Sequence, residues 1–451
     1  MSELYAGQLI QFFYERRKKM DLLTGNINKL YLKYLVASLG SAVVISVYSF
    51  VDTIAVGQYE GPVGAAAMAV INPLYGFTVF IALLCGIGGS VLMSKEKGSG
   101  DERAGNTYFT ASLILMALLS LIFWVSMFLF YPQIFKILGA DENLMPYVEK
   151  YAKWIIWFYP FFLFSPFLAC FLRNDNAPAL AMKAVICGGI VNIFGDWFLV
   201  FPLNMGMEGA AVATVIGTTT QVIILLSHFF SKNCHLLLVR PVHTLQSIKS
   251  VIGIGISSSV IEVANVVLIS LFNNQIMRYG GANELAIFGV IATIAALIQA
   301  LYSGVGQTVQ PIVSANLGAN QTTRMTQTFH RAVITVMIMG GIFISVGLLF
   351  PEQVVQIFMS GSQEILTLAS ESIRIYFFAF LFMGMTIVSI YYLQAKMKAR
   401  ISFVLSVLRG IVISGLFVCF LPLFMGMNGI WLSVPMAEFV TMMIAVICLK
   451  N

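Results

Sequence analysis

The sequence predicts an all-α integral membrane protein with twelve transmembrane helices in two six-helix bundles. Of its 451 residues, 59% are hydrophobic and 10% are charged, against about 25% charged in soluble domains. Twelve apolar runs approach or exceed the roughly 20 residues needed to cross a bilayer. An internal repeat at a spacing of roughly 220 residues divides these runs into two equal sets. The two sets predict two bundles.

The twelve predicted spans each carry at most two charged residues. They cover residues 34–57, 64–93, 108–131, 154–172, 180–201, 209–230, 250–277, 285–314, 332–350, 375–395, 401–422 and 429–449. The longest hydrophilic stretch between them, which lies between the sixth and seventh spans, predicts a domain boundary. We expect an N-terminal segment at 1–30, a first bundle at 31–232, a linker at 233–249 and a second bundle at 250–451.

The repeat is visible in two pairs of segments. Residues 86–106 align with 304–324 at an offset of 218, and PLNMGMEGA at 202–210 recurs as PLFMGMNGI at 422–430. Each unit holds an even number of spans, so both units have the same orientation in the membrane. They are therefore related by a pseudo-twofold axis along the membrane normal.

Lys and Arg are distributed unevenly between the two sides. If both termini are cytoplasmic, twenty of the 26 basic residues lie inside, Lys97 and Arg173 among them, five lie outside, and Arg409 falls within the eleventh span. The positive-inside rule favours this topology in a cell (inner) membrane. The net charge of +6 then indicates contact with membrane lipids and not with nucleic acid. Residues 1–30 are expected to form a cytoplasmic or interfacial segment.

Metal sites and disulfides are not expected. The six cysteines lie mostly within the spans and form no CxxC motif. The four histidines fall at or near the ends of predicted helices, where solvated side chains are expected: His228, His235, His243 and His330.

Four oxygen-bearing side chains share one depth in the first half. Asp196 lies in an apolar span, where a carboxylate costs at least about 3 kcal/mol unless it faces a partner or water. Asp52 lies about 8 Å below the outer surface at 1.5 Å per residue, and Asn192 and Thr214 are near the same level. Hard cations prefer oxygen ligands, and a buried carboxylate can instead carry a proton. The four residues predict a site for Na⁺ or H⁺, with hydrogen-bonded packing as the alternative.

The second half does not copy these acids, but it carries three charges of its own. Glu262 lies near the middle of the seventh span and is either a cavity acid, for protons or a cationic substrate, or a structural hydrogen-bonding group. Arg409 and Glu438 reach similar mid-membrane depths, so we expect a structural ion pair. Alternatively, Glu438 lines the substrate path.

Four segments resemble the multidrug and toxic compound extrusion (MATE) family. They are residues 28–61 with VDTIAVG, the N-x-x-x-D spacing of Asn192 and Asp196, GMEGAAVAT at 206–214, and LRNDNAP at 172–178. The resemblance covers nearly the whole chain and is closest to bacterial multidrug branches with an Asp in helix 1. It implies a secondary-active antiporter that exports amphiphilic, often cationic organic compounds in exchange for H⁺ or Na⁺, by alternating access and without a cofactor.

The resemblance also has departures. Glu262 matches in place the acid of helix 7 that, in some branches, joins a cation site with an acid of helix 10. Residues 375–395 contain no carboxylate, which puts a sodium site in the second half in doubt. The proline often found early in helices 1 and 7 is also absent.

Other function classes are weaker. A flippase for a lipid-linked precursor would need a cationic cavity, whereas the interior charges predicted here are acidic apart from Arg409. A membrane-embedded prenyl transferase would need aspartate-rich metal motifs, and neither these nor GxSxG or HExxH occur. We therefore expect no enzyme. The expected partners are small organic substrates and lipids, with the chain as a monomer.

Overall fold

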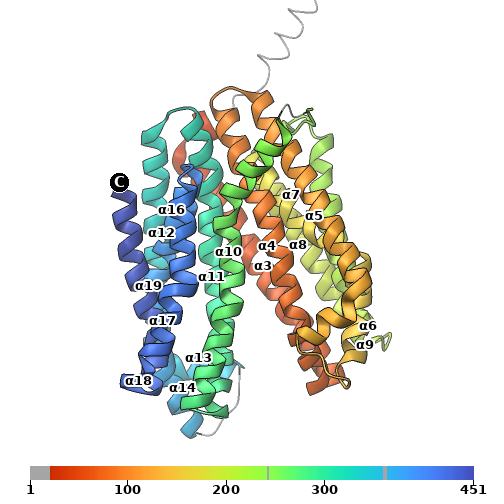
Figure 1. Cartoon of the computed structure of the whole chain (residues 1–451), viewed down its shortest axis with the longest axis vertical. Helices are drawn as coiled ribbons and strands as arrows, with labels where there is room; N and C mark the ends of the chain where they lie inside the picture. Colours follow the sequence, from red (N-terminus) through yellow and green to blue (C-terminus); the bar gives the residue numbers. More distant parts are fainter. Residues whose placement is uncertain (1–20, 241–242, 359–362, 451) are drawn as a thin grey trace, which may run out of the picture.

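The computed structural model describes residues 21–450 except 241–242 and 359–362, and every regular element in this part of the chain is helical. The predicted N-terminal segment lies mostly in residues 1–20, outside the described residues. A short helix, α2 (Asp21–Thr24), precedes the first bundle. Figure 1 shows two helical bundles that meet at one end of the molecule and diverge at the other.

The first bundle is formed by six spans, of which the fourth, fifth and sixth contain a break or a change of helix type. Its elements are α3 (Ile27–Glu60), α4 (Pro62–Gly98), α5 (Glu102–Ile137), α6 (Met145–Trp157), α7 (Tyr159–Asn174), α8 (Pro178–Gly195), the π-helical turn η1 (Asp196–Val200), α9 (Gly206–Leu226) and the 3₁₀ turn η2 (Ser227–Phe230).

The second bundle repeats this order with more breaks. Its elements are α10 (Thr244–Tyr279), α11 (Ala282–Gly318), α12 (Thr322–Leu349), α13 (Pro351–Phe358), α14 (Gln363–Tyr376), α15 (Ala379–Ala395), α16 (Ala399–Val407), the π-helical turn η3 (Leu408–Val412), α17 (Ile413–Phe420), α18 (Pro422–Met425) and α19 (Met427–Lys450).

Eleven helices of the described chain are long and apolar enough to cross a membrane, and a bent pair, α6 and α7, makes twelve. This confirms the predicted number of spans. The prediction of one continuous fourth span at 154–172 is wrong, because α6 and α7 meet at an angle of 57°. Pro160, in the first turn of α7, explains the break: proline starts a helix readily but cannot donate to the preceding turn.

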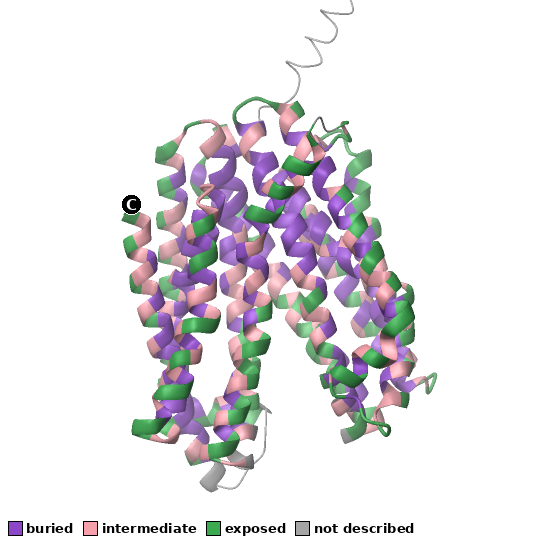
Figure 2. Ribbon diagram, in the orientation of Figure 1, coloured by how far each residue is buried: buried purple, intermediate pink, exposed green. Residues whose placement is uncertain are grey.

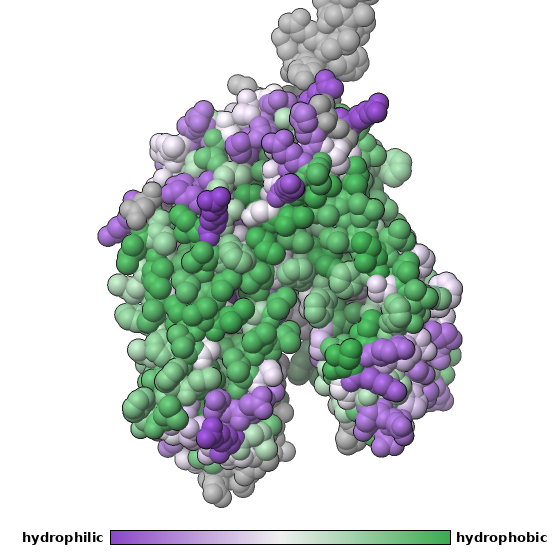
Figure 3. All heavy atoms as spheres, in the orientation of Figure 1, coloured by the Kyte–Doolittle hydropathy of each residue, from purple (hydrophilic) through white to green (hydrophobic). Residues whose placement is uncertain are grey.

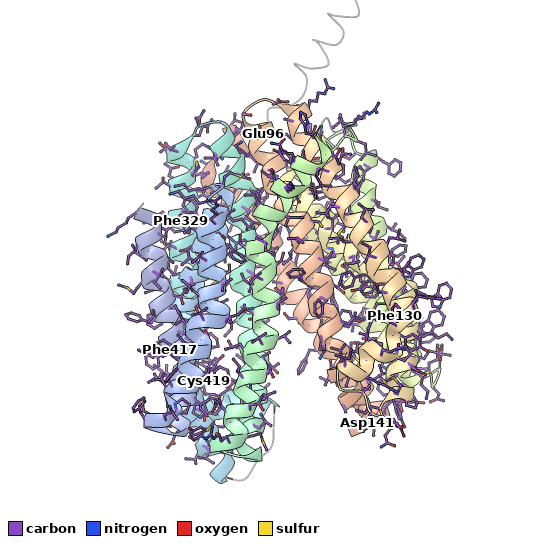
Figure 4. All side chains as sticks on the ribbon, in the orientation of Figure 1. Glu96, Phe130, Asp141, Phe329, Phe417 and Cys419 are labelled. Atoms are coloured by element: carbon purple, nitrogen blue, oxygen red, sulfur yellow. The ribbon has the colours of Figure 1, made fainter. Side chains whose placement is uncertain are left out.

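The surface has the pattern of a protein that sits in a bilayer. Figure 3 shows a hydrophobic band around the middle of the molecule, with hydrophilic side chains gathered at both ends. Glu96 lies at the end where the bundles meet and Asp141 at the end where they diverge, as Figure 4 shows. We call these the closed end and the open end. The linker and the C-terminus lie toward the closed end (Figure 1).

The bundles meet through glycines, and Figure 2 shows many buried residues in this region. A Cβ atom added to Gly88 of α4 would lie 2.1 Å from the carbonyl oxygen of Val251 in α10. One added to Gly255 of α10 would lie 2.0 Å from the carbonyl oxygen of Leu84 in α4. Two further glycines approach a carbonyl equally closely where α4 meets α11: Gly98 and Gly318. Only glycine allows backbones to approach this closely. We call these four residues the glycine seam.

Candidate functional site

A cavity of about 540 Å³ lies between the bundles. Helices α3, α4, α7, α8 and α9 line it from the first bundle, and α10, α11 and α15 line it from the second. Figure 3 shows the space between the bundles as a hollow toward the open end. Of the residues singled out from the sequence, four line the cavity: Asp52, Asn192, Thr214 and Glu262. The volume suits a drug-sized molecule, since such pockets measure roughly 300 to 1,000 Å³.

The polar residues of the first bundle form one hydrogen-bonded group. The hydroxyl of Tyr151 in α6 donates a 2.9 Å hydrogen bond to Oδ2 of Asp52 in α3. The same hydroxyl lies 3.5 Å from Oγ1 of Thr214 in α9. Asn192 of α8 donates through Nδ2 to Thr214 Oγ1 at 3.1 Å. We call these residues together with Asp196 the oxygen cluster.

Asp196 begins the π-helical turn η1 and is completely buried. Among the described residues neither of its carboxylate oxygens has a hydrogen-bond partner, and the same is true of Asp52 Oδ1 and Asn192 Oδ1. Asp52 is close enough to Asp196 for its charge to act on that carboxylate. Two buried carboxylates without a counter-charge are strongly unfavourable. The four unpaired oxygens therefore suit a hard cation or protons, which would supply the missing positive charge.

Small residues explain why α8 and α9 come close enough to share this cluster. A Cβ atom added to Gly217 of α9 would lie 2.7 Å from the carbonyl oxygen of Gly188 in α8, and one added to Gly195 would lie 2.8 Å from Cβ of Ala213. The two backbones pack directly against each other along this contact. The short side chains of Asn192 and Thr214 can therefore meet across the two helices.

Tyr151 was not found from the sequence, although it connects Asp52 to Thr214. The fourth span was placed at 154–172 because Tyr147, Glu149, Lys150 and Lys153 lower the hydropathy before it. The structure starts this span at α6, so Tyr151 lies two turns inside a helix. If the span is started at Met145, counting residues along it places the Tyr151 hydroxyl near the depth of Asp52.

The second bundle places its predicted charges differently. Glu262 of α10 lines the cavity, and within the described residues no hydrogen bond or ion pair to its side chain is found. Arg409 of η3 donates through Nε to Glu438 Oε1 of α19 at 2.8 Å, and its Nη2 lies 2.8 Å from the same oxygen in an ion pair. Nη2 also lies 3.3 Å from Oε1 of Gln299, which does line the cavity. Both charged side chains of this pair are buried, at 7% and 5% exposed.

Asp175, at the closed end of α7, is the centre of a second polar group. Its Oδ2 lies 2.8 Å from His228 Nε2 and accepts a 2.8 Å bond from the backbone N–H of His235. Lys97 Nζ lies 3.5 Å from Oδ1. Burial by itself would raise the pKa of Asp175, but the bonds to the two histidines and the charge of Lys97 hold that pKa below its usual range.

This group corrects two expectations from the sequence. His228 was expected to be solvated, but it is 3% exposed, because the chain after η2 folds back over the end of α7. Lys97 was expected to face the aqueous inside, but it is buried against Asp175. The ligand atoms of Asp175, His228 and Cys234 lie within 4.8 Å of one another. Since Lys97 already neutralises the carboxylate, the group acts as an ion pair that fastens the linker to the first bundle.

Arg173 is the third residue whose surroundings differ from those expected. It was placed among the basic residues facing the inside, yet it is only 8% exposed and lines the cavity. The cavity therefore contains a cation as well as Asp52 and Glu262. The last turn of α7 forms part of the cavity wall at the closed end. Hydropathy alone does not show which helix ends line a cavity.

Comparison with known proteins agrees with this architecture. The family model described as MatE matches residues 37–198 and 258–421, most of both bundles. A probable multidrug resistance protein YoeA of Bacillus subtilis is 25% identical over 360 residues, covering 78% of this chain and 77% of its own. A multidrug export protein MepA of Staphylococcus haemolyticus is 24% identical over 403 residues, covering 88% of each chain.

A solved structure, described as the outward-facing conformation of a multidrug resistance MATE family transporter of the MOP superfamily, has the same fold. Its TM-score is 0.88 at 20% identity, and the match covers 96% of this chain and 97% of that one. Matches of this kind extend through both bundles and include the helices that line the cavity.

Proposed function

The chain belongs to the MatE family of multi-pass membrane transporters and is not an enzyme, and we propose that it exports amphiphilic organic compounds, often cationic ones, in exchange for H⁺ or Na⁺. The observation that carries this proposal is the oxygen cluster beside the cavity, with four buried oxygens that lack partners. The names of the related multidrug proteins support the drug-like substrate class. No cofactor is needed, since the ion gradient supplies the energy.

The coupling residues in this proposal are Asp52 and Asp196, with Asn192 and Thr214 supplying neutral oxygens. An ion or proton enters when the cavity is empty, because the two carboxylates repel each other without it. Antiport requires that ion and drug each weaken the binding of the other, by roughly 1 to 3 kcal/mol. The cluster adjoins the cavity, so a change in its charge is felt there directly.

The two bundles provide the alternating access. We assign residues 31–232 and 250–451 to two units that rock about the cavity, joined by residues 233–249. Glu262, without a partner in the cavity wall, is assigned to protons or to the cationic group of a substrate. Arg409 and Glu438 are assigned a structural role within the second unit.

The orientation follows from the basic residues. The closed end is assigned to the cytoplasm of the cell (inner) membrane, with both termini there, because it carries the larger share of Lys and Arg. The open end then faces outward. The protein is expected to function as a monomer surrounded by membrane lipids.

Purified protein in liposomes tests the proposal. The liposomes contain a cationic rhodamine ester, and gradients of Na⁺ and of H⁺ are imposed separately and together. Dye movement should follow one gradient and stop when an ionophore collapses that gradient alone. Liposomes without protein serve as the control. Dye movement that is unchanged with both gradients collapsed would contradict antiport.

A further inference from the structure

The guanidinium of Arg173 is a buried cation for which the described part of the chain supplies no partner. Arg173 is the second-last residue of α7 and lines the cavity at 8% exposure. Its Nε is buried without a hydrogen bond. Within the described residues no ion pair involves this side chain, and the bond from the Tyr34 hydroxyl reaches only the backbone carbonyl of Arg173.

The chain itself cannot neutralise this charge. The neighbouring carboxylate, Asp175, is already held by Lys97, His228 and His235. The cost of leaving such a cation alone is evident from Arg409, which the same protein surrounds with Glu438 and Gln299. An unpaired buried arginine is stable only where something else supplies the negative charge.

The free nitrogens of Arg173 face open space. Nη1 and Nη2 are not among the buried atoms without partners, although neither makes a hydrogen bond, so both remain accessible from the cavity. Guanidinium groups present a planar fork of N–H donors that matches the two oxygens of a carboxylate. The missing partner is therefore an anion that arrives with the cavity's contents.

The charges of the cavity are ordered along its depth. Arg173 lies at the closed end of α7, whereas Glu262 lies near the middle of α10 (Thr244–Tyr279). Asp52 lies further still toward the open end of α3, eight residues before its last residue, Glu60. A molecule that enters from the open end meets acids first and the single base last.

We propose that Arg173 forms an anion subsite at the deep end of the cavity, which binds the carboxylate of zwitterionic substrates whose amine faces Glu262. The subsite rests on the proposed export function and narrows its substrate class. Cations without an acid group occupy only the part of the cavity toward the open end, near Glu262 and Asp52. Compounds that carry both groups span the whole depth and bind more tightly.

Two dyes that differ in one group test the subsite. The first is a rhodamine with a free benzoate carboxylate, and the second is the methyl ester of the same dye. Binding of each to the detergent-purified full chain is measured by fluorescence anisotropy. The parent should bind the acid about tenfold more tightly than the ester, as expected for a charge-assisted hydrogen-bonded pair. This comparison needs no substitution, and a parent that binds the ester as tightly as the acid overturns the subsite.

Substitutions locate the effect. Arg173→Gln should weaken the acid about tenfold and leave the ester within about twofold, so that the preference disappears. Arg173→Lys should restore part of the preference, because the charge is kept and the fork is lost. Arg278→Gln, which removes an exposed basic residue of α10, should leave both dyes unchanged.

The outcomes separate the two proposals. Equal weakening of both dyes by Arg173→Gln, or no change in either, overturns the anion subsite while drug binding stands. Failure of the parent to bind either dye overturns drug binding in this cavity, and the narrower substrate class falls with it.

Discussion

Each bundle interrupts one of its helices with a π-helical turn that carries a charged residue, and the two bundles treat that charge in opposite ways. Asp196 in η1 has no hydrogen-bond partner for either oxygen. Arg409 in η3 donates a hydrogen bond to Glu438 and forms an ion pair with it. π-Turns disturb the regular backbone and occur often at functional sites. The turn alone does not decide the role of its residue.

The difference lies in where the counter-charge comes from. In the second bundle it is supplied by the chain, as Glu438, and the ion pair holds α19 against η3. In the first bundle the charge that acts on Asp196 is that of Asp52, which has the same sign. In the function proposed above, the counter-charge of Asp196 therefore comes from solution, and the two bundles use their π-turn charges differently.

Breaking the connection in the second bundle should produce the largest effect. Arg409→Ala leaves Glu438 buried and unpaired, which should lower the free energy of unfolding by about 3 to 5 kcal/mol. Thermal unfolding in detergent, followed by size-exclusion chromatography, measures the loss. Replacing Arg409 and Glu438 together by leucine should recover much of it. A double variant no more stable than Arg409→Ala would show that the pair is not the source of the effect.

Removing the charge from the first bundle should affect transport and leave stability largely intact. Asp52→Asn and Asp196→Asn keep the shape of the side chain, and each should reduce ion-driven efflux by up to about 100-fold, within the range of typical coupling energies. Initial rates in liposomes measure this. Thermal stability should stay at or above that of the parent, since an unpaired buried charge is lost. Parent rates with unchanged ion dependence in both variants would place the coupling site elsewhere, with Glu262 the next candidate.

Asp175 lies in the first bundle but has partners of its own, so its removal should affect stability, as removal of Arg409 does in the second bundle. Asp175→Asn should lower the free energy of unfolding by about 2 kcal/mol at neutral pH, because charged hydrogen bonds are lost, with no change in ion dependence. The pKa of Asp175 lies below its usual range in the folded state. Its contribution is therefore complete above the ordinary value of about 3.9 and is lost as the pH falls through the lower, folded-state pKa.

Unfolding of the parent and of Asp175→Asn at a series of pH values tests this sign. The difference between them should be constant between about pH 5 and pH 6 and should shrink below about pH 4. Glu142→Gln, at an exposed position, is the matched control and should show no such difference. A gap that grows on acidification would contradict the assigned role of Asp175.

The sequence was sufficient for the membrane class, the number of spans and the repeat, because all three depend on composition and spacing. Depth counting also placed Asp52, Asn192, Asp196 and Thr214 at one level, and the structure brings them together. Counting worked here because α3 and α9 continue without a break through these residues.

Counting residues from the ends of the spans failed where the surroundings of a side chain depend on a break in a helix or on a loop that folds back over the bundle. Tyr151 was missed because charged neighbours masked the start of the fourth span. Arg173 and His228 were both assigned to aqueous surroundings because each lies near the end of a span. In the structure they are covered by segments distant in the sequence, and hydropathy contains no information about those contacts.

The glycine seam also has an energetic consequence. At each of its four positions a glycine Cα–H points toward a carbonyl oxygen of the opposite bundle, and weak bonds of this type contribute about 0.5 to 1 kcal/mol each. Glycine has no side chain, so separation of the bundles would require no rotamer change at these four positions. The four contacts of the glycine seam together contribute a few kcal/mol, which is the scale of the free energy that one bound ion or drug molecule can shift in the transport cycle proposed above.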